Sequence, residues 1–201
     1  MSDQNKPVEE LDVVTIRFAG DSGDGMQLTG TQFTDNTAIF GNDLSTLPDY
    51  PAEIRAPAGS LAGVSSFQLQ FSNQDIHTPG DDLDVLVAMN PAALKVHLSD
   101  LQENGMVLVN TANFTKKNLG LAGYENDPLE DDTLKHYRSI KVDMTKLVTT
   151  ALADSGLTPK LMARSTNMFA LGLLYWLYER DMDSSINFIT KKFAKKPDII
   201  D

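Results

Sequence analysis

The chain has 201 residues, with 17 lysine or arginine residues against 28 aspartate or glutamate residues and a formal net charge of −11. This acidity argues against nucleic acid or an anionic membrane surface as the main partner, because both require basic patches. No cysteine is present, which excludes disulfides, thiol catalysis and iron–sulfur clusters ligated by this chain. No stretch approaches the roughly 20 apolar residues that cross a bilayer, and the first ten residues lack an apolar signal core. We therefore expect a cytoplasmic protein without a membrane partner.

The most informative stretch is a glycine-rich turn between an apolar strand and a helix. Residues 13–18 have the β-branched and aromatic character of a buried strand. Residues 26–40 are predicted to form a helix that ends at Gly41 in the usual C-cap manner. Between them lies Gly-Asp-Ser-Gly-Asp-Gly, residues 20–25. Because the first amides of a helix have no internal partner, this turn is a natural place to hold a ligand.

Two interpretations of the turn stay open. As a ligand cradle, its three glycines would let another molecule approach the main chain closely. The dinucleotide fingerprint is incomplete, because Leu28 stands where the third glycine belongs, and no lysine follows for a phosphate loop. The alternative is a tight strand-to-helix turn in which Asp21 or Asp24 caps the helix and complements its dipole.

A second candidate segment is the proline-rich loop 49–63, which has the composition of an ordered loop rather than a linker. Functional residues are often carried on such loops. Its Arg55 has two open interpretations. It binds an anionic group, or it pairs with Glu53 or another surface carboxylate.

The remaining elements follow from hydrophobic patterning. Residues 64–72 alternate from Phe67 onward and predict a strand with one polar face that can run antiparallel. Residues 83–89 form an apolar run typical of a central parallel strand, followed by Asn90 as a helix N-cap and Pro91 in the first turn. We also predict strands at 44–47, 106–109 and 139–142 and an irregular acidic surface excursion at 114–138. Helices are predicted at 91–102, from the N-cap Asp143 to near Gly156, at 165–178 and at 184–193.

This element order predicts a single α/β domain with a mostly parallel or mixed sheet flanked by helices and a Rossmann-like first β-turn-α unit. We expect residues 1–12 to be a disordered tail, residues 13–196 to form the domain, and residues 197–201 to begin a linker to a missing downstream domain. The three histidines are scattered without clustered carboxylates, so no metal site is expected. No serine stands in a nucleophile elbow, and no catalytic residue is predicted.

Four segments, taken together, resemble a known family. They are Phe-Ala-Gly-Asp-Ser-Gly-Asp-Gly-Met (18–26), Tyr-Pro-Ala-Glu-Ile-Arg-Ala-Pro-Ala-Gly (50–59), Asp-Val-Leu-Val-Ala-Met-Asn (84–90) and Asn-Met-Phe-Ala-Leu-Gly (167–172). In this order they resemble the gamma domain of 2-oxoacid:acceptor (ferredoxin/flavodoxin) oxidoreductases. The resemblance covers nearly the whole chain from residue 13. It is closest to the N-terminal part of the alpha subunit of bacterial 2-oxoglutarate-type enzymes.

The resemblance implies a function that the residues alone do not show. Such enzymes oxidatively decarboxylate a 2-oxoacid, here 2-oxoglutarate, to an acyl-coenzyme A. Thiamine diphosphate and iron–sulfur clusters are held by other domains, so this chain would bind no cofactor alone and would be inactive alone. The implied partners are the thiamine-binding alpha and beta domains, with ferredoxin or flavodoxin as acceptor of the whole complex. In the family the gamma domain packs beside the thiamine site and is associated with coenzyme A access.

Carried over by position, the resemblance places the glycine turn and the following loop at the assembly's active region. Arg55 would bind an anionic group, and Ser22 and backbone amides would donate hydrogen bonds. Many separate gamma subunits carry Gly-Gly-Gln-Gly and Arg-Gly-Gly at these places, and this departure argues against direct phosphate binding by the turn. The expected site residues are Gly20, Asp21, Ser22, Gly23, Asp24, Gly25, Arg55, Gly59 and Asn90.

Two further functions stay open on the residues alone. The glycine turn could serve a stand-alone nucleotide binder, for which saturable binding of NAD or ADP would be the signature. The apolar helix 165–178 could instead be the docking face of a non-catalytic interaction module.

Overall fold

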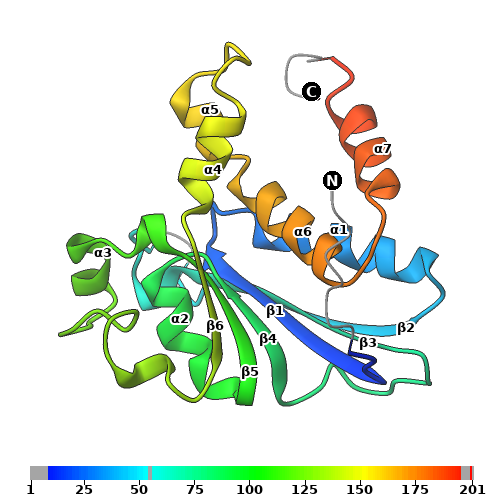
Figure 1. Cartoon of the computed structure of the whole chain (residues 1–201), viewed down its shortest axis with the longest axis horizontal. Coiled ribbons are helices and arrows are strands. Elements are labelled where there is room, and N and C mark those ends of the chain that lie inside the picture. The colour runs from blue at the N-terminus through cyan, green and yellow to red at the C-terminus, as the bar shows by residue number, and fades with distance from the viewer. Residues whose placement is uncertain (1–8, 54–55, 196–199, 201) are drawn as a thin grey trace.

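The computed structural model describes residues 9–53, 56–195 and 200, and it confirms the predicted α/β domain with a mixed sheet (Figure 1). The strand order is β2-β3-β1-β4-β5-β6, and β3 is antiparallel to both of its neighbours while the other neighbouring pairs are parallel. The antiparallel direction expected for the alternating strand is thus confirmed. The strands are β1 Val13–Asp21, β2 Asp43–Asp49, β3 Val64–Ser72, β4 Leu83–Ala88, β5 Leu101–Asn110 and β6 Arg138–Val142.

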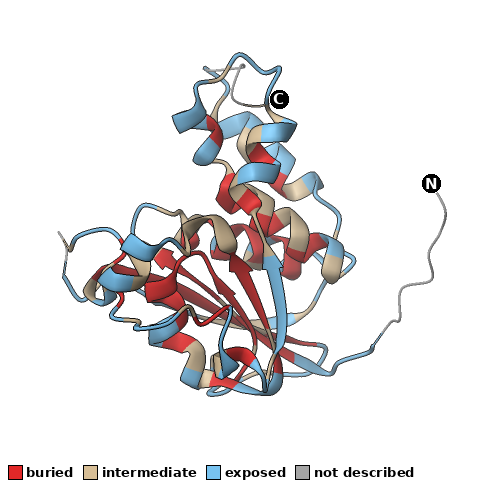
Figure 2. Ribbon diagram, turned by 60° about the vertical axis from the view of Figure 1, so that its left-hand side comes forward, coloured by how far each residue is buried: buried red, intermediate tan, exposed pale blue. Residues whose placement is uncertain are grey.

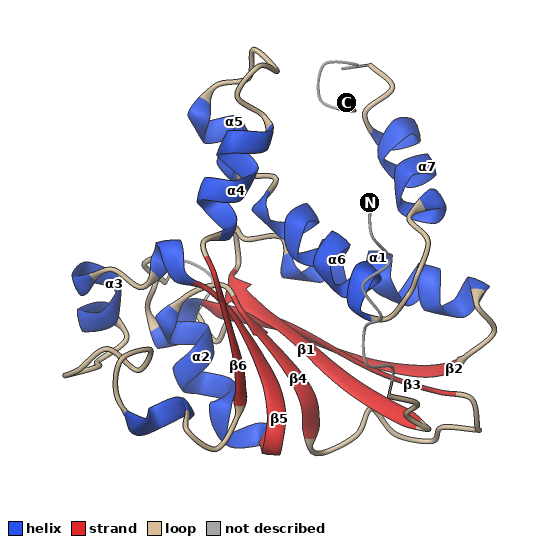
Figure 3. Cartoon of the chain, viewed as in Figure 1, coloured by secondary structure: helices blue, strands red, loops and turns tan. Residues whose placement is uncertain are grey.

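Helices cover both faces of the sheet (Figure 3). On one face α1 and α6 lie side by side against the strands, and α4, α5 and α7 rise from this layer. On the other face lie α2 and α3. Their bounds are α1 Met26–Ile39, α2 Pro91–His97, α3 Lys116–Leu121, α4 Met144–Ala151, α5 Pro159–Ala163, α6 Thr166–Leu177 and α7 Asp183–Lys192.

Two apolar cores, one on each face, follow from the side-chain alternation of the strands. Figure 2 shows the buried residues gathered along the strands and on the helix faces that meet them. On the α1 side the fully buried Phe33 packs against Phe18, Phe71 and Tyr175, with ring centroids 5.6–6.1 Å apart. Such aromatic contacts add stability beyond that of area burial. This core fixes α1, and with it the glycine turn, on the sheet.

The sheet has a topological switch point between β1 and β4. These strands are parallel neighbours, with Ala19 opposite Ala88 near their carboxyl ends. Helix α1 follows β1 and packs on one face, whereas α2 follows β4 and packs on the other. In open α/β sheets, ligands bind in the crevice outside the carboxyl ends of strands at such a point. The glycine turn lies at this edge.

Several predicted boundaries were wrong. The helix expected at 91–102 ends at His97, a single 3₁₀ turn follows, and β5 begins at Leu101, which pairs with Leu83. Asn104 and Gly105, which follow the expected helix, lie within β5, where the pairing with β4 is irregular and Asn104 adopts a φ of 63°. Helix α4 ends at Ala151 rather than near Gly156. In β5, pairing with β4 overrode the local helical pattern of residues 101 and 102.

Two surfaces expected to be polar and solvated are covered. The excursion 114–138 contains α3 and buries Ala122, Leu129 and Leu134 in the core beneath α2. The polar face of β3 is also buried, because the Gln68 side-chain amide donates to the Pro79 and Gly80 carbonyls of the following loop, both at 2.7 Å. The alternation of side chains along β3 predicted correctly which face is polar. It did not predict that the following loop covers this face.

Candidate functional site

The glycine turn leaves the carboxyl end of β1 and enters α1 at the switch point (Figure 1). β1 is longer than predicted, so Gly20 and Asp21 are its last two residues and residues 22–25 form the turn. The structure brings this turn beside Gly59 from the loop before β3. Asn90, which follows β4, lies near Asp21.

Asp21 ties this loop to the turn. Its carboxylate accepts the Gly59 amide hydrogen, with N–O distances of 2.9 and 3.1 Å. Gly59 has a φ of +84°, a left-handed conformation that favours glycine. Burial raises the pKa of Asp21, whereas the hydrogen bond from the Gly59 amide and the proximity of the Asn90 side-chain amide act to lower it. The carboxylate therefore acts as an anchor for residues 56–60.

Asp24 closes the turn on itself. Its backbone amide donates to the Asp21 carbonyl at 2.9 Å, and its carboxylate Oδ2 accepts from the Asp21 amide at 2.9 Å. Burial, opposed by this hydrogen bond, raises the pKa of Asp24 to about 6. The Asp24 side chain lies directly beside Gly20.

The expected aspartate cap on α1 was wrong. The N-cap residue is Gly25, with φ +76°, and no side chain hydrogen-bonds to the first turn of the helix. The physical reason is that other amides compete with those of the helix for the two carboxylates. Asp21 accepts a hydrogen bond from the Gly59 amide, and Asp24 accepts one from the Asp21 amide. The first amides of α1 are consequently left open.

The tip of the turn is exposed at Ser22 and Gly23. Ser22 makes no hydrogen bond with any residue in the described part of the chain, so its hydroxyl can serve a ligand or a partner. A side chain at Gly23 would meet open space. Arg55 lies outside the described residues, and both interpretations of it stay predictions.

Asn90 has a structural role that the sequence predicted correctly. Its Oδ1 accepts from the Ala93 amide at 2.8 Å, which caps α2, and Pro91 occupies the first turn. Its Nδ2 is buried and hydrogen-bonds to no described residue, although the amide is close enough to Asp21 to help lower the pKa of that carboxyl. This leaves one buried donor beside the turn.

Asn167 was missing from the predicted site. It is the second residue of α6, only 7% exposed, and its Nδ2 would lie 2.5 Å from a Cβ atom on Gly25. A Cβ atom there would displace this amide, and the left-handed φ of +76° independently favours glycine at residue 25. The sequence signal was the polar opening of an otherwise apolar helix, Ser-Thr-Asn at 165–167.

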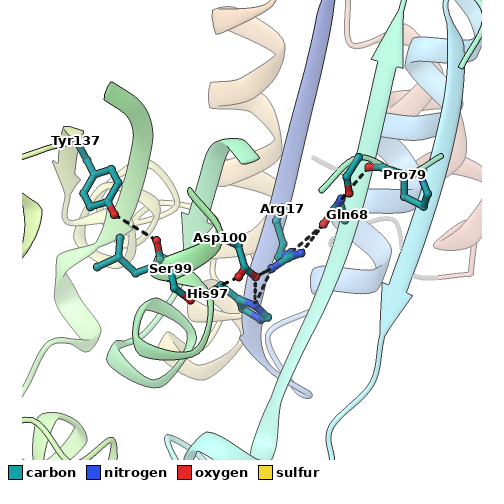
Figure 4. A network of polar contacts seen from close by, with 9 residues as sticks. Arg17, Gln68, Pro79, His97, Ser99, Asp100 and Tyr137 are labelled. Carbon is teal, nitrogen blue, oxygen red and sulfur yellow. Dashed lines mark hydrogen bonds and ion pairs between the residues drawn. The ribbon is translucent and has the colours of Figure 1, made fainter. Parts of the chain in front are cut away.

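A second polar region, also not predicted, surrounds Arg17 in the middle of β1 (Figure 4). The guanidinium pairs with Asp100 and donates from Nε to Gln68 Oε1 at 3.1 Å. Its Nη1 lies 3.0 Å from His97 Nδ1. Because arginine can only donate, Nδ1 accepts and the neutral imidazole carries its proton on Nε2.

Burial and the Arg17 charge lower the pKa of His97 to about 4. The same region lines a pocket of about 400 Å³ that also includes Leu47 and Asp49 of β2. The sequence offered no signal for this network, since its members come from β1, β3 and α2 and from the turn that follows α2.

The chemistry available at the glycine turn is binding rather than covalent catalysis. The turn presents amides and the Ser22 hydroxyl as donors, and no nucleophile–base pair is seen among the residues described. Within the same part of the chain, no group of three or more histidine, cysteine, aspartate or glutamate residues could hold a metal ion. None of the helices described is both long and apolar enough to cross a membrane.

Comparison with known sequences identifies relatives, one of which matches almost the whole chain. The chain is 57% identical over 191 residues to the 2-oxoglutarate oxidoreductase subunit KorA of Mycobacterium tuberculosis, covering 95% of this chain and 29% of the relative. It is 32% identical over 111 residues to the ketoisovalerate oxidoreductase subunit VorA of Methanothermobacter marburgensis, covering 54% of this chain and 22% of the relative. The chain thus spans less than a third of the length of these relatives.

Solved structures share the fold. The 2-oxoglutarate:ferredoxin oxidoreductase of Magnetococcus marinus, solved with 2-oxoglutarate, coenzyme A and succinyl-CoA bound, matches with a TM-score of 0.68 at 22% identity, covering 93% of this chain and 28% of that chain. The gamma subunit of the keto/oxoacid ferredoxin oxidoreductase of Geobacter sulfurreducens matches with a TM-score of 0.59 at 19% identity, covering 93% of both chains.

The match to a gamma subunit over 93% of its length agrees with the fold expected from the four segments. Residues 15–201 match the family model described as pyruvate ferredoxin/flavodoxin oxidoreductase. The resemblance seen in the sequence is confirmed, and this chain belongs to the pyruvate ferredoxin/flavodoxin oxidoreductase family.

Proposed function

We propose that this chain is the gamma domain of a thiamine-diphosphate-dependent 2-oxoacid:ferredoxin oxidoreductase. The intact enzyme would convert 2-oxoglutarate and coenzyme A to succinyl-coenzyme A and CO₂, with two electrons passing to ferredoxin or flavodoxin. The observation that carries this proposal is the 57% identity to a 2-oxoglutarate oxidoreductase subunit over 95% of the chain.

In this proposal the domain contributes binding surface and not the redox chemistry. Thiamine diphosphate and the iron–sulfur clusters would be held by the alpha and beta domains, which is consistent with a chain that contains no cysteine. The domain would be inactive alone and would work in the cytoplasm within a multi-subunit complex.

We infer that the carboxyl edge of the sheet faces the active region of the assembly. The support is its position at the switch point, the open first amides of α1, and the loop that Asp21 anchors beside them. The contributing residues would be Gly20, Asp21, Ser22, Gly23, Asp24, Gly25, Arg55, Gly59 and Asn90.

The test is an assay of the intact protein that contains this chain, with its natural partner subunits. We expect reduction of ferredoxin that requires 2-oxoglutarate, coenzyme A and thiamine diphosphate together, and that is slower with pyruvate or 2-oxoisovalerate. A protein that contains no thiamine diphosphate and reduces no acceptor with any 2-oxoacid would refute the proposal.

The nucleotide-binder alternative has its own test in the same protein. Gly23→Val meets no steric obstacle, because nothing lies within 4 Å of a Cβ atom there. Saturable NAD or ADP binding that this variant abolishes would favour the alternative. Binding of neither nucleotide would rule it out.

A further inference from the structure

The sheet face that carries α2 is left open toward β2. Helix α2 packs on β1, β3 and β4. Leu47 of β2 is the register partner of Gln68, which is in turn the partner of Arg17 in β1. Directly opposite residues share a face, so Leu47 lies on the same side of the sheet as the Arg17 network, and it is 48% exposed. This face therefore presents an open surface beside the network.

The pocket of about 400 Å³ lies at this surface, between the end of α2 and β2. Its inner lining is polar, and Figure 4 shows Arg17 with Gln68 on one side and with His97 and Asp100 on the other. Its exposed lining includes apolar side chains from both elements, which are Leu47, Pro48 and Val96. Apolar walls around a few fixed polar groups are typical of a site that binds another molecule.

The pocket carries one negative charge that the chain does not compensate. Arg17 and Asp100 form an ion pair, so their charges offset each other. Asp49, at the end of β2, is exposed and forms no ion pair with any residue that the structure describes. A carboxylate beside apolar side chains suits lysine or arginine, whose long apolar stem ends in a cation.

His97 supplies an independent sign of a missing partner. It lines the pocket and is only 5% exposed. Its Nδ1 faces Arg17, so Nε2 carries the proton, and Nε2 is buried without a hydrogen-bond acceptor. Such a donor costs free energy unless an acceptor from outside the chain satisfies it. Asp49 would repel an anion here, so a neutral carbonyl oxygen is the better acceptor.

We propose that this pocket docks a basic polypeptide segment from the part of the intact enzyme that lies outside these 201 residues. A lysine or arginine side chain of the segment lies along Leu47 and Val96 and pairs with Asp49. A main-chain carbonyl oxygen of the same segment accepts from His97 Nε2. The match covers only 29% of the KorA relative, which leaves ample chain to supply the segment.

The proposal rests on the proposed function only in that a larger enzyme surrounds this domain. It is independent of the reaction, and its tests read contacts rather than turnover. Their failure would therefore leave the proposed function untouched.

Photo-crosslinking in the intact enzyme tests the contact. The photoreactive residue p-benzoylphenylalanine replaces Tyr50, which is 68% exposed next to Asp49, or Val96 on the α2 side of the pocket. We expect at least one probe to reach a peptide from outside residues 1–201 with a lysine or arginine at or beside the cross-linked position. The same probe at Ile186, exposed on α7, should not reach that peptide. Cross-links from both pocket positions that stay within this domain, or that reach only segments without a basic residue, overturn the proposal.

Charge reversal separates a specific ion pair from mere proximity. Asp49→Lys, made together with the probe at position 50, should lower the cross-link yield about tenfold. Replacing the partner's basic residue by aspartate in the same protein should restore the yield. Asp154→Lys makes the same charge change at an exposed position after α4 and should leave the yield unchanged. If Asp49→Lys fails to fold, Asp49→Asn should give a smaller loss of yield. An unaltered yield in the folded Asp49 variant, or an equal loss in Asp154→Lys, overturns the proposal.

A structure of the intact enzyme tests the role of His97. We expect a main-chain carbonyl oxygen of the docked segment within hydrogen-bond distance of Nε2. A water molecule or a carboxylate in that place overturns the proposal.

Discussion

At the carboxyl edge of the sheet, the carboxylates of Asp21 and Asp24 bond to backbone amides, whereas around Arg17 the charged side chains bond to one another. Both regions involve residues of β1. Burial raises the pKa values of the two acids at the edge and lowers that of His97 in the network. The edge leaves helix amides open, whereas in the network the donors of Arg17 and Gln68 are bonded within the chain and the His97 Nε2 donor is buried without a described partner. The edge is accordingly built to bind something, and the network is built to hold the sheet and α2 together.

The largest expected effect comes from breaking the Arg17 network. Arg17→Ala would leave Gln68 Oε1 and His97 Nδ1 without their donor in a buried setting, so we expect a loss of about 3 kcal/mol in the free energy of unfolding. Chemical denaturation measures it. Arg138→Ala is the control, because that side chain is 61% exposed, and it should change stability by less than about 1 kcal/mol. Equal effects would mean that the network is not structural.

The second effect is a pH dependence of stability from His97. Its folded pKa of about 4 lies below the usual 6.5, so between these values the unfolded state binds the extra proton. Stability should therefore be unaffected above pH 6.5 and fall as the pH drops toward 4, by up to about 3 kcal/mol. The groups that set this pKa are Arg17, which lowers it, and Asp49 and Asp100, which raise it.

Urea denaturation at several pH values checks this dependence. His97→Gln should flatten the fall between pH 6.5 and 4, whereas His77→Gln, at an exposed position, should leave it unchanged. An unaltered profile in His97→Gln would assign the pH dependence to other groups.

Asp24 should give a pH dependence of stability with the opposite sign to that of His97. Its folded pKa of about 6 lies above the usual 3.8, so the folded state keeps the proton over that interval. The penalty of the buried charge is absent below pH 3.8 and complete above pH 6. Asp24→Asn keeps an oxygen acceptor for the Asp21 amide, and we expect it to raise stability at pH 7 by about 1 kcal/mol, with no gain at pH 3.5. A gain of the same size at both pH values would exclude this charge as the cause.

The sequence predicted the edge better than the network, for a physical reason. Helix caps and turns depend on neighbours along the chain, so Asn90 and Asp143 were correctly assigned as N-caps. The open first turn of α1 was missed because Asp21 found a competing amide in Gly59, which is remote in sequence. Asn167 was missed as a site residue for the same reason, since only the parallel packing of α6 on α1 brings it over Gly25.

The network could not be predicted because no local pattern encodes it. Gln68 followed the alternation of β3 to the face that was expected to be polar, but the loop that covers it comes from tertiary folding. His97 was expected in the middle of a helix and instead ends α2, where it meets Arg17. The fold class, by contrast, depends on the order of apolar segments, which tolerates such errors.

The smallest expected effect is at the anchor between the turn and the loop. Asp21→Ala removes the acceptor of the Gly59 amide. Gly59 is buried, but Asp21 is only half-buried, so removing its side chain lets water reach the amide, and the loss of stability should be about 1 kcal/mol. The effect should appear locally, as faster hydrogen exchange of the Gly59 amide and faster proteolysis of the loop, with α7 unchanged. If the edge faces the active region, the intact enzyme should lose activity out of proportion to this small loss of stability. Wild-type exchange at Gly59 in this variant would show that the loop is held by something other than Asp21, and the case for Asp21 as an anchor would end there.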